Sequence, residues 1–313
     1  MNRTLHIIHR DIGGVGAITK RLAEQGDSRI ELASLKLTDV FKIIQYKKIS
    51  FHQPFSHFIA CLLFPLYFLR KVRISIILHE AADYDLSISK RSKKYIRRKI
   101  VNLCIIFGYE VRSVSQYISS TYGVKKSLVS YTQLFENDLS RITPIQNKYK
   151  SNALVWLRQG DAERALQYIK ALEKIYKVKS IAILGNVNEC QRILALVVNE
   201  KINRKINIIG ELSQEELLFV LSSIKWFITP YSREGFGLTA FQAMYYGAMV
   251  ITPYAGALRE WLPSDNFRLS NDILNAQQWT DLELIGLSEI NTAHAKKMLQ
   301  LSHEASTKDE FFY

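Results

Sequence analysis

The residues most able to do chemistry lie in the segment REGFGLTAFQAMYYG, which runs from Arg233 to Gly247. It follows an apolar run typical of a buried strand, and its pattern predicts a glycine-flanked turn leading into a helix. The first helical amides, around Gly237–Thr239, have no intrahelical acceptor, and helix starts of this kind bind phosphate. Glu234 stands before that start and Gln242 lies further along the helix. A carboxylate beside an anion site indicates a ligand with hydroxyls or developing positive charge; alternatively, Glu234 only stabilises the helix dipole.

The next segment, AMVITPYAGALREWL, repeats the pattern of an apolar strand, a glycine turn and a helix start that carries Glu260. Together, Trp226–Leu262 resembles the donor-site signature of the family-4 glycosyltransferases, which are retaining enzymes of the GT-B fold. Glu234 occupies the position of the first glutamate of that signature, and Gln242 that of the second. The resemblance implies that Glu234 is catalytic, holding sugar hydroxyls near the reacting carbon, and that Gln242 faces the ribose of the donor.

The glutamine at position 242 leaves a second interpretation open. Its amide oxygen can still accept a hydrogen bond from ribose, so the expected loss of donor binding is about 1–2 kcal/mol. The alternative to an active enzyme is therefore a catalytically retired GT-B partner subunit that binds a glycan or another transferase.

A pair of arginines in WLRQGDAER follows the first predicted strand of the second half of the chain. Two fixed cations, Arg158 and Arg164, can neutralise a leaving diphosphate without a metal; alternatively, both are exposed loop residues. The resemblance implies donor binding by both, with Arg158 matching the family's arginine and Arg164 its usual lysine by charge only. It also implies donor-binding roles for Gly14, Gly16, Leu212, Phe236, Gly237, Leu238 and Thr239.

Two features of the first half bear on the same site. The apolar strand ISIILHE ends at His79 and Glu80, where ligands of open α/β sheets bind. The resemblance implies that His79 is a catalytic residue close to the transferred sugar, the alternative being a core histidine at a strand end. The turn DIGGVG, which contains Gly14 and Gly16, also fits part of a dinucleotide fingerprint, so a dinucleotide-dependent oxidoreductase is a remote alternative.

Strand-like and helix-like segments alternate through both halves, which predicts an α/β fold with parallel sheets. We expect a GT-B architecture of two Rossmann-like domains facing a central cleft. Residues 1–145 form the acceptor-side domain and residues 146–313 the nucleotide-sugar domain. A final helix around Glu289–Ala305 could pack on either domain. The predicted strands are Leu5–His9, Ile30–Leu35, Ile74–His79, Glu110–Ser113, Ala153–Leu157, Ser180–Leu184 and Ile206–Ile209. The predicted helices are Val15–Gln25, Lys90–Phe107, Gln116–Tyr122, Ala162–Tyr176, Glu189–Glu200 and Gln214–Ser222.

The net charge of +13 belongs entirely to the first half of the chain. Residues 1–150 hold 25 Lys and Arg against 11 Asp and Glu, whereas residues 151–313 hold 17 against 18. Seven of the ten residues in Lys90–Lys99 are basic. The nearby run Phe55–Leu69 is uncharged and too short to span a bilayer, so a buried helix is expected, with monotopic membrane contact as the alternative. This pattern favours an anionic membrane surface over nucleic acid as a partner, and no nucleic-acid-binding motif is present.

These features predict an enzyme that moves a sugar from a nucleotide-diphosphate donor, UDP-sugar rather than GDP-sugar, to a glycan or lipid-linked acceptor. We expect it to act in bacterial O-antigen, capsule or exopolysaccharide synthesis. No acidic pair is spaced as a divalent-metal site, so neither a metal nor a cofactor beyond the donor is expected. Cys61, Cys104 and Cys190 lie in apolar surroundings and are expected to be reduced. The expected location is the cytoplasm, peripherally on the inner face of the cell membrane.

Overall fold

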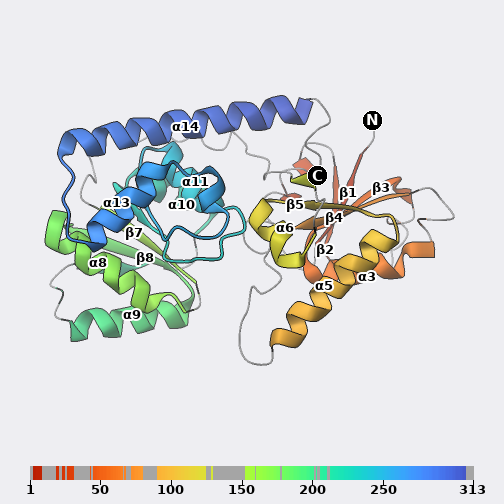
Figure 1. The fold of residues 1–313 in the computed structure, drawn as a ribbon, viewed down its shortest axis with the longest axis horizontal. Coiled ribbons are helices and arrows are strands. Elements are labelled where there is room, and N and C mark those ends of the chain that lie inside the picture. Colours follow the sequence, from red (N-terminus) through yellow and green to blue (C-terminus); the bar gives the residue numbers. More distant parts are fainter. Residues whose placement is uncertain are drawn as a thin grey trace. The chain divides into compact units, whose positions relative to one another are not determined.

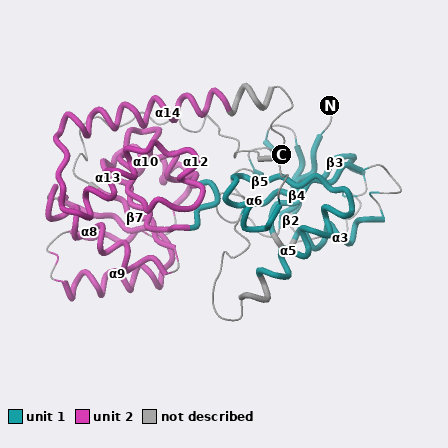
Figure 2. The backbone as a smooth tube through the Cα atoms, viewed as in Figure 1, with its two compact units in different colours: residues 1–133, 233–236, 305–313 teal, residues 134–232, 237–304 magenta. Residues whose placement is uncertain are grey.

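The computed structural model divides the chain into two compact units (Figures 1 and 2). Unit 1 comprises Met1–Gln133, Arg233–Phe236 and Ala305–Tyr313, and unit 2 comprises Leu134–Ser232 and Gly237–Glu304. The structure describes residues 3–8, 19–20, 23–24, 27–31, 43, 45–65, 67, 72–79, 90–124, 128–129, 152–158, 160–176, 178–200, 202, 205–209 and 212–307. The domain boundary predicted between residues 145 and 146 lies outside these ranges.

Unit 1 contains a parallel sheet with the strand order β2-β1-β3-β4-β5-β6. Its strands are β1 (Leu5–Ile8), β2 (Ser28–Glu31), β3 (Lys48–Phe51), β4 (Arg73–Leu78), β5 (Glu110–Ser113) and β6 (Leu128–Val129). Its helices include α3 (Pro54–Leu62), α5 (Lys90–Ile106) and α6 (Gln116–Tyr122). All four residues of β1, and Ile74 through Leu78 of β4, are buried, as expected for strands covered on both faces.

Unit 2 contains a second parallel sheet with the order β11-β10-β7-β8-β9. Its strands are β7 (Asn152–Leu157), β8 (Ser180–Gly185), β9 (Lys205–Ile208), β10 (Trp226–Ile228) and β11 (Met249–Ile251). Its described helices are α8 (Ala162–Tyr176), α9 (Val187–Asn199), α10 (Gln214–Ser222), α11 (Leu238–Tyr245), α12 (Leu258–Trp261), α13 (Ser264–Leu274) and α14 (Asp281–Thr307). Strands alternate with helices in both units, as the sequence predicts.

The long helix α14 belongs to unit 2 as far as Glu304 (Figure 2). Asn291 of α14 donates a hydrogen bond from Nδ2 to the carbonyl oxygen of Ala248, over 2.9 Å. Its Oδ1 accepts one from Nδ2 of Asn266 in α13, at 2.7 Å. The two buried amides therefore join α14 and α13 to the start of β11, and each satisfies polar atoms of the other.

Four elements have the bounds predicted from sequence: Glu110–Ser113, Gln116–Tyr122, Ala162–Tyr176 and Gln214–Ser222. Strand β3 was not predicted, although it lies inside the sheet between β1 and β4. The strand predicted from Ile30 begins earlier, at Ser28, because Ser28 already pairs with Leu5 of β1. Of the apolar run Phe55–Leu69, helix α3 covers the part up to Leu62.

Helix α3 packs on α5 through two cysteines whose proximity the sequence spacing does not indicate. The Sγ atoms of Cys61 and Cys104 lie 3.5 Å apart, and both are free thiols. Burial raises the pKa of each thiol, so both are protonated at neutral pH and behave as packing residues.

Candidate functional site

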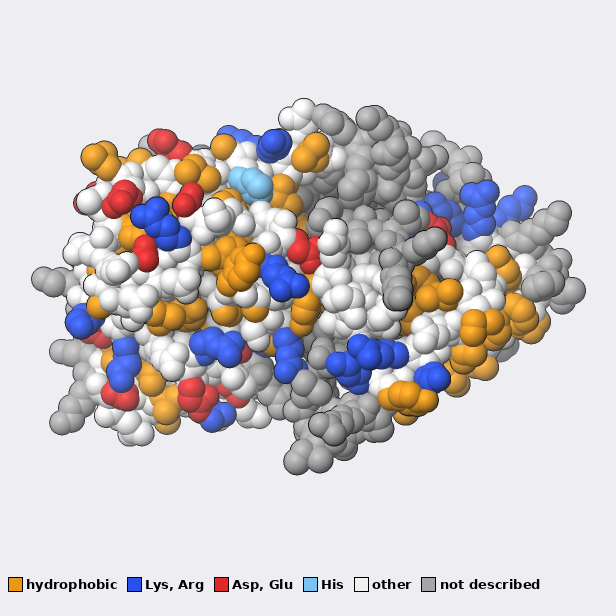
Figure 3. All heavy atoms as spheres, viewed as in Figure 1, with side chains coloured by type: hydrophobic (Ala, Val, Ile, Leu, Met, Phe, Trp, Pro, Cys, Tyr) orange, Lys and Arg blue, Asp and Glu red, His pale blue; other side chains and the backbone are white. Residues whose placement is uncertain are grey.

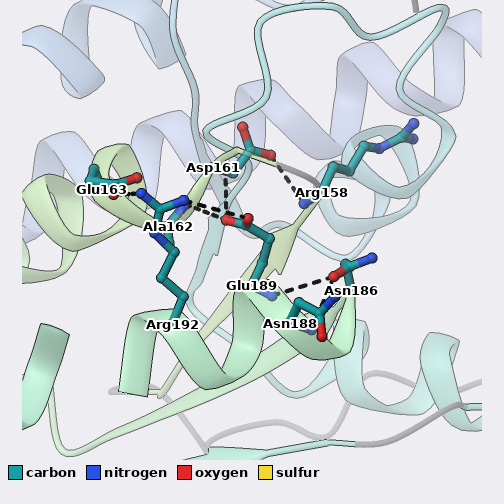
Figure 4. A network of polar contacts seen from close by, with 8 residues as sticks. All are labelled: Arg158, Asp161, Ala162, Glu163, Asn186, Asn188, Glu189 and Arg192. Carbon is teal, nitrogen blue, oxygen red and sulfur yellow. Dashed lines mark hydrogen bonds and ion pairs between the residues drawn. The ribbon is translucent and has the colours of Figure 1, made fainter. Parts of the chain in front are cut away.

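The loop after β7 presents Arg158. The backbone nitrogen of this residue donates a hydrogen bond to Oδ2 of Asp161, over 3.0 Å. Its guanidinium carbon lies 4.9 Å from the centre of the Tyr231 ring, a cation–π distance. Figure 4 shows the side chain pointing away from the carboxylates of Asp161 and Glu189. Asp161 therefore holds the backbone of Arg158, while the aromatic ring supports its charged end.

The loop is fixed by a carboxylate from the neighbouring helix (Figure 4). Glu189 of α9 is buried, and its Oε2 accepts hydrogen bonds from the backbone nitrogens of Asp161 and Ala162, at 3.1 and 3.0 Å. These amides are at the start of α8, where an anion interacts favourably with the helix dipole. The start of α8 thus holds a protein carboxylate, and this arrangement fixes the turn from which Arg158 projects.

Arg164 lies in the first turns of α8 and reaches the same segment as Arg158. Its Nη1 donates to the carbonyl oxygen of Pro230 at 2.7 Å, next to the Tyr231 ring that Arg158 covers. The structure therefore brings the two predicted cations to adjacent residues, Pro230 and Tyr231. Tyr231, Asp161 and Glu189 were not predicted from the sequence as supporting residues. An Asp just before a predicted helix is a recognisable signal, whereas Glu189 is too distant in sequence to give one.

Helix α11 begins at Gly237, which has a φ of +89°. This backbone conformation requires glycine, and a Cβ atom at this position would also lie 2.4 Å from Cδ2 of Leu258 and displace that side chain. Because the N-cap is a glycine, it offers no side chain to the first amides of the helix. Leu238 and Thr239 form the first turn, and Gln242 further along is buried.

The segment Arg233–Phe236 clusters with unit 1 and not with the strand that precedes it. Glu234 and Phe236 are both buried. A Cβ atom on Gly235 would lie 2.2 Å from the carbonyl oxygen of His79 and 3.6 Å from Cδ1 of Ile118. The structure therefore brings together two predicted catalytic segments that are far apart in sequence, the Glu234 loop and the end of β4.

This contact makes Gly235 sensitive to substitution. We expect Gly235→Ala to lower the free energy of unfolding by about 1–3 kcal/mol, because its Cβ would collide with a backbone atom that cannot rotate away. The matched control is Gly286→Ala in α14, where a Cβ meets nothing within 4 Å. That substitution should raise stability by about 1 kcal/mol through helix propensity. Thermal unfolding of both variants is the measurement, and equal melting temperatures would contradict the close approach of Gly235 to His79.

His79 follows β4 and is half-buried. Its Nε2 lies 3.0 Å from Nδ1 of His52, a residue that was not predicted to belong to the site. His57, on α3, is buried and its Nε2 lies 3.2 Å from the carbonyl oxygen of Ile77. Burial lowers the pKa of His79 to about 3 and that of His57 to about 4, because the charged form of each ring loses hydration.

The two units should respond differently to acid. His57 and His79 titrate near pH 6.5 when unfolded and only near pH 4 and 3 when folded, so the unfolded state binds more protons below pH 6.5. Unit 1 should therefore lose stability as the pH falls below 6.5, by about 1.4 kcal/mol per pH unit for a buried histidine. In unit 2, burial raises the pKa of Asp161 from 3.8 to about 6. The folded state then binds more protons between these values, so this group increases the stability of unit 2 as the pH falls.

Tryptophan fluorescence separates these responses, because all four tryptophans belong to unit 2. Urea unfolding followed by far-ultraviolet circular dichroism reports both units. At pH 5 the loss of ellipticity should begin at a lower urea concentration than the fluorescence change. The difference between these two urea concentrations should be larger at pH 5 than at pH 7. A gap that stays constant between these pH values would contradict the assigned titrations.

Three further residues, Gly14, Gly16 and Leu212, were predicted from the sequence to bind the donor. Gly14 and Gly16 lie outside the described residues. Leu212 is half-buried before Ser213, the N-cap of α10, and its contact with a nucleobase stays a prediction. Within the described ranges, no three His, Cys, Asp or Glu side chains are grouped as a metal site. Nor does any described helix have the length and apolarity needed to cross a bilayer.

Comparison with known proteins finds a family match and similar folds. Residues 158–269 match the family described as Glycosyl transferases group 1. HepE (Alr3699) from Anabaena, solved with UDP and glucose, is 13% identical with a TM-score of 0.71, over 98% of this chain and 100% of that one. A glycosyltransferase from Rickettsia africae is 15% identical with a TM-score of 0.68, over 99% of this chain and 98% of that one. Sucrose-phosphate synthase from Thermosynechococcus elongatus is 14% identical with a TM-score of 0.64, over 98% of this chain and 100% of that one. No curated protein sequence matches the chain.

The chain therefore has the GT-B fold that the sequence predicts, and residues 158–269 of its second half match the glycosyl transferases group 1 family. The matched range begins at Arg158 and extends past Gln242 into α13. It thus contains both arginines, the Glu234 loop and the start of α11.

Proposed function

We propose that this protein is a retaining glycosyltransferase that transfers a sugar from a nucleotide-diphosphate donor, with a UDP-sugar favoured. The observation that carries the proposal is the family match over residues 158–269, a range that includes every donor-site residue predicted in the second half of the chain. The choice of UDP is supported by HepE, which was solved with UDP and glucose and also with UDP-glucose.

In the proposed reaction the bond between the anomeric carbon and the leaving phosphate oxygen breaks, and the acceptor oxygen bonds to that carbon on the same face. The acceptor proton passes to the leaving phosphate. Negative charge that develops on the diphosphate would be met by Arg158, Arg164 and the first amides of α11. Asp161 and Glu189 hold the Arg158 loop in place before the donor binds, so little reorganisation is needed.

Glu234 would accept hydrogen bonds from sugar hydroxyls next to the reacting carbon, and Gln242 would contact the ribose through its amide. His79 would contact the transferred sugar from the acceptor-side unit. Arg158 and Arg164 supply two positive charges, so no divalent metal is needed to stabilise the leaving group.

The acceptor is proposed to be a glycan or lipid-linked molecule reached at an anionic membrane surface. Helix α5 carries Tyr95, Ile96, Leu103 and Ile106 within about 100° of one another on the helical wheel. These four side chains, here called the α5 apolar face, are between 44% and 75% exposed. Figure 3 shows hydrophobic and basic side chains side by side on this part of unit 1. Lys99 lies between Ile106 and Leu103 on the helical wheel, and its Nζ is 5.3 Å from the ring centre of Tyr95.

An exposed apolar stripe with basic neighbours is the arrangement by which peripheral helices bind anionic leaflets. Phe58 and Leu62 of the adjoining helix α3 are also exposed, which extends the apolar surface. We place the protein on the cytoplasmic face of a bacterial membrane, in the assembly of O-antigen, capsule or exopolysaccharide.

The test is incubation of the purified protein with UDP-, GDP- and ADP-sugars, with and without EDTA, followed by detection of the released nucleotide. Slow hydrolysis of a UDP-sugar that EDTA leaves unchanged is the expected result. Proton NMR of the first sugar product would give its anomeric configuration. Binding of no nucleotide-sugar would favour the retired partner subunit, and activity restored only by Mg²⁺ or Mn²⁺ would contradict the metal-free mechanism.

A further inference from the structure

A continuous chain of hydrogen bonds runs through unit 1 and ends at His79. Nε2 of His6 lies 2.9 Å from Oδ2 of Asp27. Nδ1 of His6 lies 2.9 Å from Nε2 of His52, and Nδ1 of His52 lies 3.0 Å from Nε2 of His79. His6 and His52 are fully buried. Each of these two rings uses both nitrogens within the chain.

The register of the sheet explains why the four side chains meet. Asp27 precedes β2 and His6 lies in β1, whereas His52 follows β3 and His79 follows β4. The chain of hydrogen bonds therefore crosses these four strands in their order in the sheet. His6 is level with the residue two positions beyond Asp27. His52 lies two positions beyond the β3 partner of His6, and His79 two positions beyond the level of His52 on β4. Steps of two residues keep all four on one face of the sheet.

The chain has a defined polarity because Asp27 can only accept. Burial alone would raise the pKa of Asp27, but hydrogen bonds from His6 and from the backbone of Thr4 hold it below its ordinary value. The ionised carboxylate requires a proton on Nε2 of His6, and in the neutral form of this ring Nδ1 is then the acceptor. His52 then carries its proton on Nε2, and His79 does the same. Nδ1 of His79 is therefore the hydrogen-bond acceptor of that ring.

His52 and His79, the last two histidines of the chain, are neutral. Burial lowers the pKa of His52 well below its ordinary value, and its neighbours His6, His79 and His57 add to this, because a second positive charge in the chain is unfavourable. A neutral imidazole has one donor and one acceptor, so the proton position on His6 determines those on His52 and His79.

We propose that Asp27, His6 and His52 are positioning residues that hold His79 with its proton on Nε2, so that Nδ1 accepts a hydrogen bond from a hydroxyl of the transferred sugar. The proposal rests on the proposed function for the identity of the ligand. Its location follows from the backbone of His79, whose carbonyl oxygen packs on Gly235, next to Glu234. The backbone at His79 and the Glu234 loop thus lie against each other, and the side chains of both residues contain hydrogen-bond acceptors.

Asp27→Asn is the decisive substitution because the surrounding contacts determine how the amide must lie. The backbone nitrogen of Thr4 donates to Oδ1 of Asp27 over 2.8 Å, so the oxygen of the new amide faces Thr4. Its NH₂ group then faces His6 and donates to Nε2. Each ring must shift its proton to Nδ1, and His79 becomes a donor at the nitrogen proposed to accept. A change of tautomer with unchanged geometry is known to impair histidine-dependent catalysis severely.

The experiment is long-range ¹H–¹⁵N correlation spectroscopy on the full chain with labelled histidine, together with kcat/KM for UDP-sugar hydrolysis or transfer. Wild type should show His6, His52 and His79 protonated on Nε2. Asp27→Asn should show all three protonated on Nδ1 and a kcat/KM at least about tenfold lower, the effect of one hydrogen bond of about 1.4 kcal/mol. The matched control is His57→Gln, which removes a buried histidine outside the chain and should leave the three tautomers unchanged.

Two results would overturn the inference: spectra in which Asp27→Asn leaves the tautomers as in wild type, or reversed tautomers with unchanged kcat/KM. The first removes the role of Asp27, and the second removes the hydrogen bond to the sugar. Wild-type protein that turns over no nucleotide-sugar would instead overturn the proposed function, while the spectra would still decide whether Asp27 controls the tautomer of His79.

Discussion

Arg158→Ala and Glu234→Ala are each expected to lower kcat/KM for sugar transfer by about 30- to 1,000-fold, which corresponds to about 2–4 kcal/mol in the barrier. Arg158 projects from a turn held by Asp161 and Glu189, so its charge is in position before the donor arrives. Glu234 is buried next to the backbone contact between Gly235 and His79. Steady-state kinetics with a UDP-sugar, together with melting temperatures to verify folding, are the measurements.

Arg268→Ala is the matched control for Arg158. The guanidinium carbon of Arg268 lies 5.0 Å from the ring centre of Trp279, almost the same cation–π contact that Arg158 makes with Tyr231. Arg268 lies in α13 and has no proposed role with the donor. Loss of such a contact at an exposed site costs about 0.5–1 kcal/mol of stability. Folded Arg158→Ala protein with turnover like that of Arg268→Ala would show that Arg158 does not act on the leaving group.

The second large effect is expected in membrane binding. Replacing Lys90, Lys93, Lys94 and Lys99 of α5 by glutamine should weaken binding to phosphatidylglycerol vesicles by about three orders of magnitude. Each basic residue near an anionic surface contributes about 1 kcal/mol, so four contribute about 4 kcal/mol. Wild-type binding should weaken with added salt, because the attraction is screened. Co-sedimentation at low and moderate ionic strength measures both effects.

The control for this experiment has the same change in charge elsewhere. Lys174, Lys205, Lys296 and Lys297 are exposed lysines of unit 2, and their replacement by glutamine should leave vesicle binding within a few-fold of wild type. Wild-type protein that stays in the supernatant at low salt would make Lys90–Lys99 an ordinary solvated surface. A soluble acceptor would then replace the lipid-linked one.

The sequence predicted those elements best that have both a strong period and clear ends. Helix α10 begins with a capping box between Ser213 and Glu216, and α6 lies between the cap of Ser115 and Gly123 in the left-handed conformation. Such signals are local and can be read directly. Strand β3 has only four residues and begins within a pair of lysines, so its burial comes from the strands on either side, which the sequence does not place.

In the candidate site, too, only residues with a local sequence signal could be predicted. Arg158, Glu234 and Gln242 follow from motifs that are contiguous in sequence. The supporting residues do not: Glu189 reaches the Arg158 turn from the next helix, and the histidine chain depends on the order of four strands. Neither His6 nor His52 belongs to a motif within its own segment. Only the parallel register, with its repeated offset of two residues, aligns them with His79.

The grouping of Arg233–Phe236 with unit 1 has a consequence for building hybrid enzymes. A chimaera made by joining the first half of this chain to the second half of another GT-B protein would also exchange these four residues, although they pack with unit 1. The incoming loop would have to carry glycine at position 235, because any side chain there meets the His79 carbonyl oxygen. Hybrids that retain Arg233–Phe236 from the parent of unit 1 should therefore fold more often than hybrids joined at a single point between the two halves.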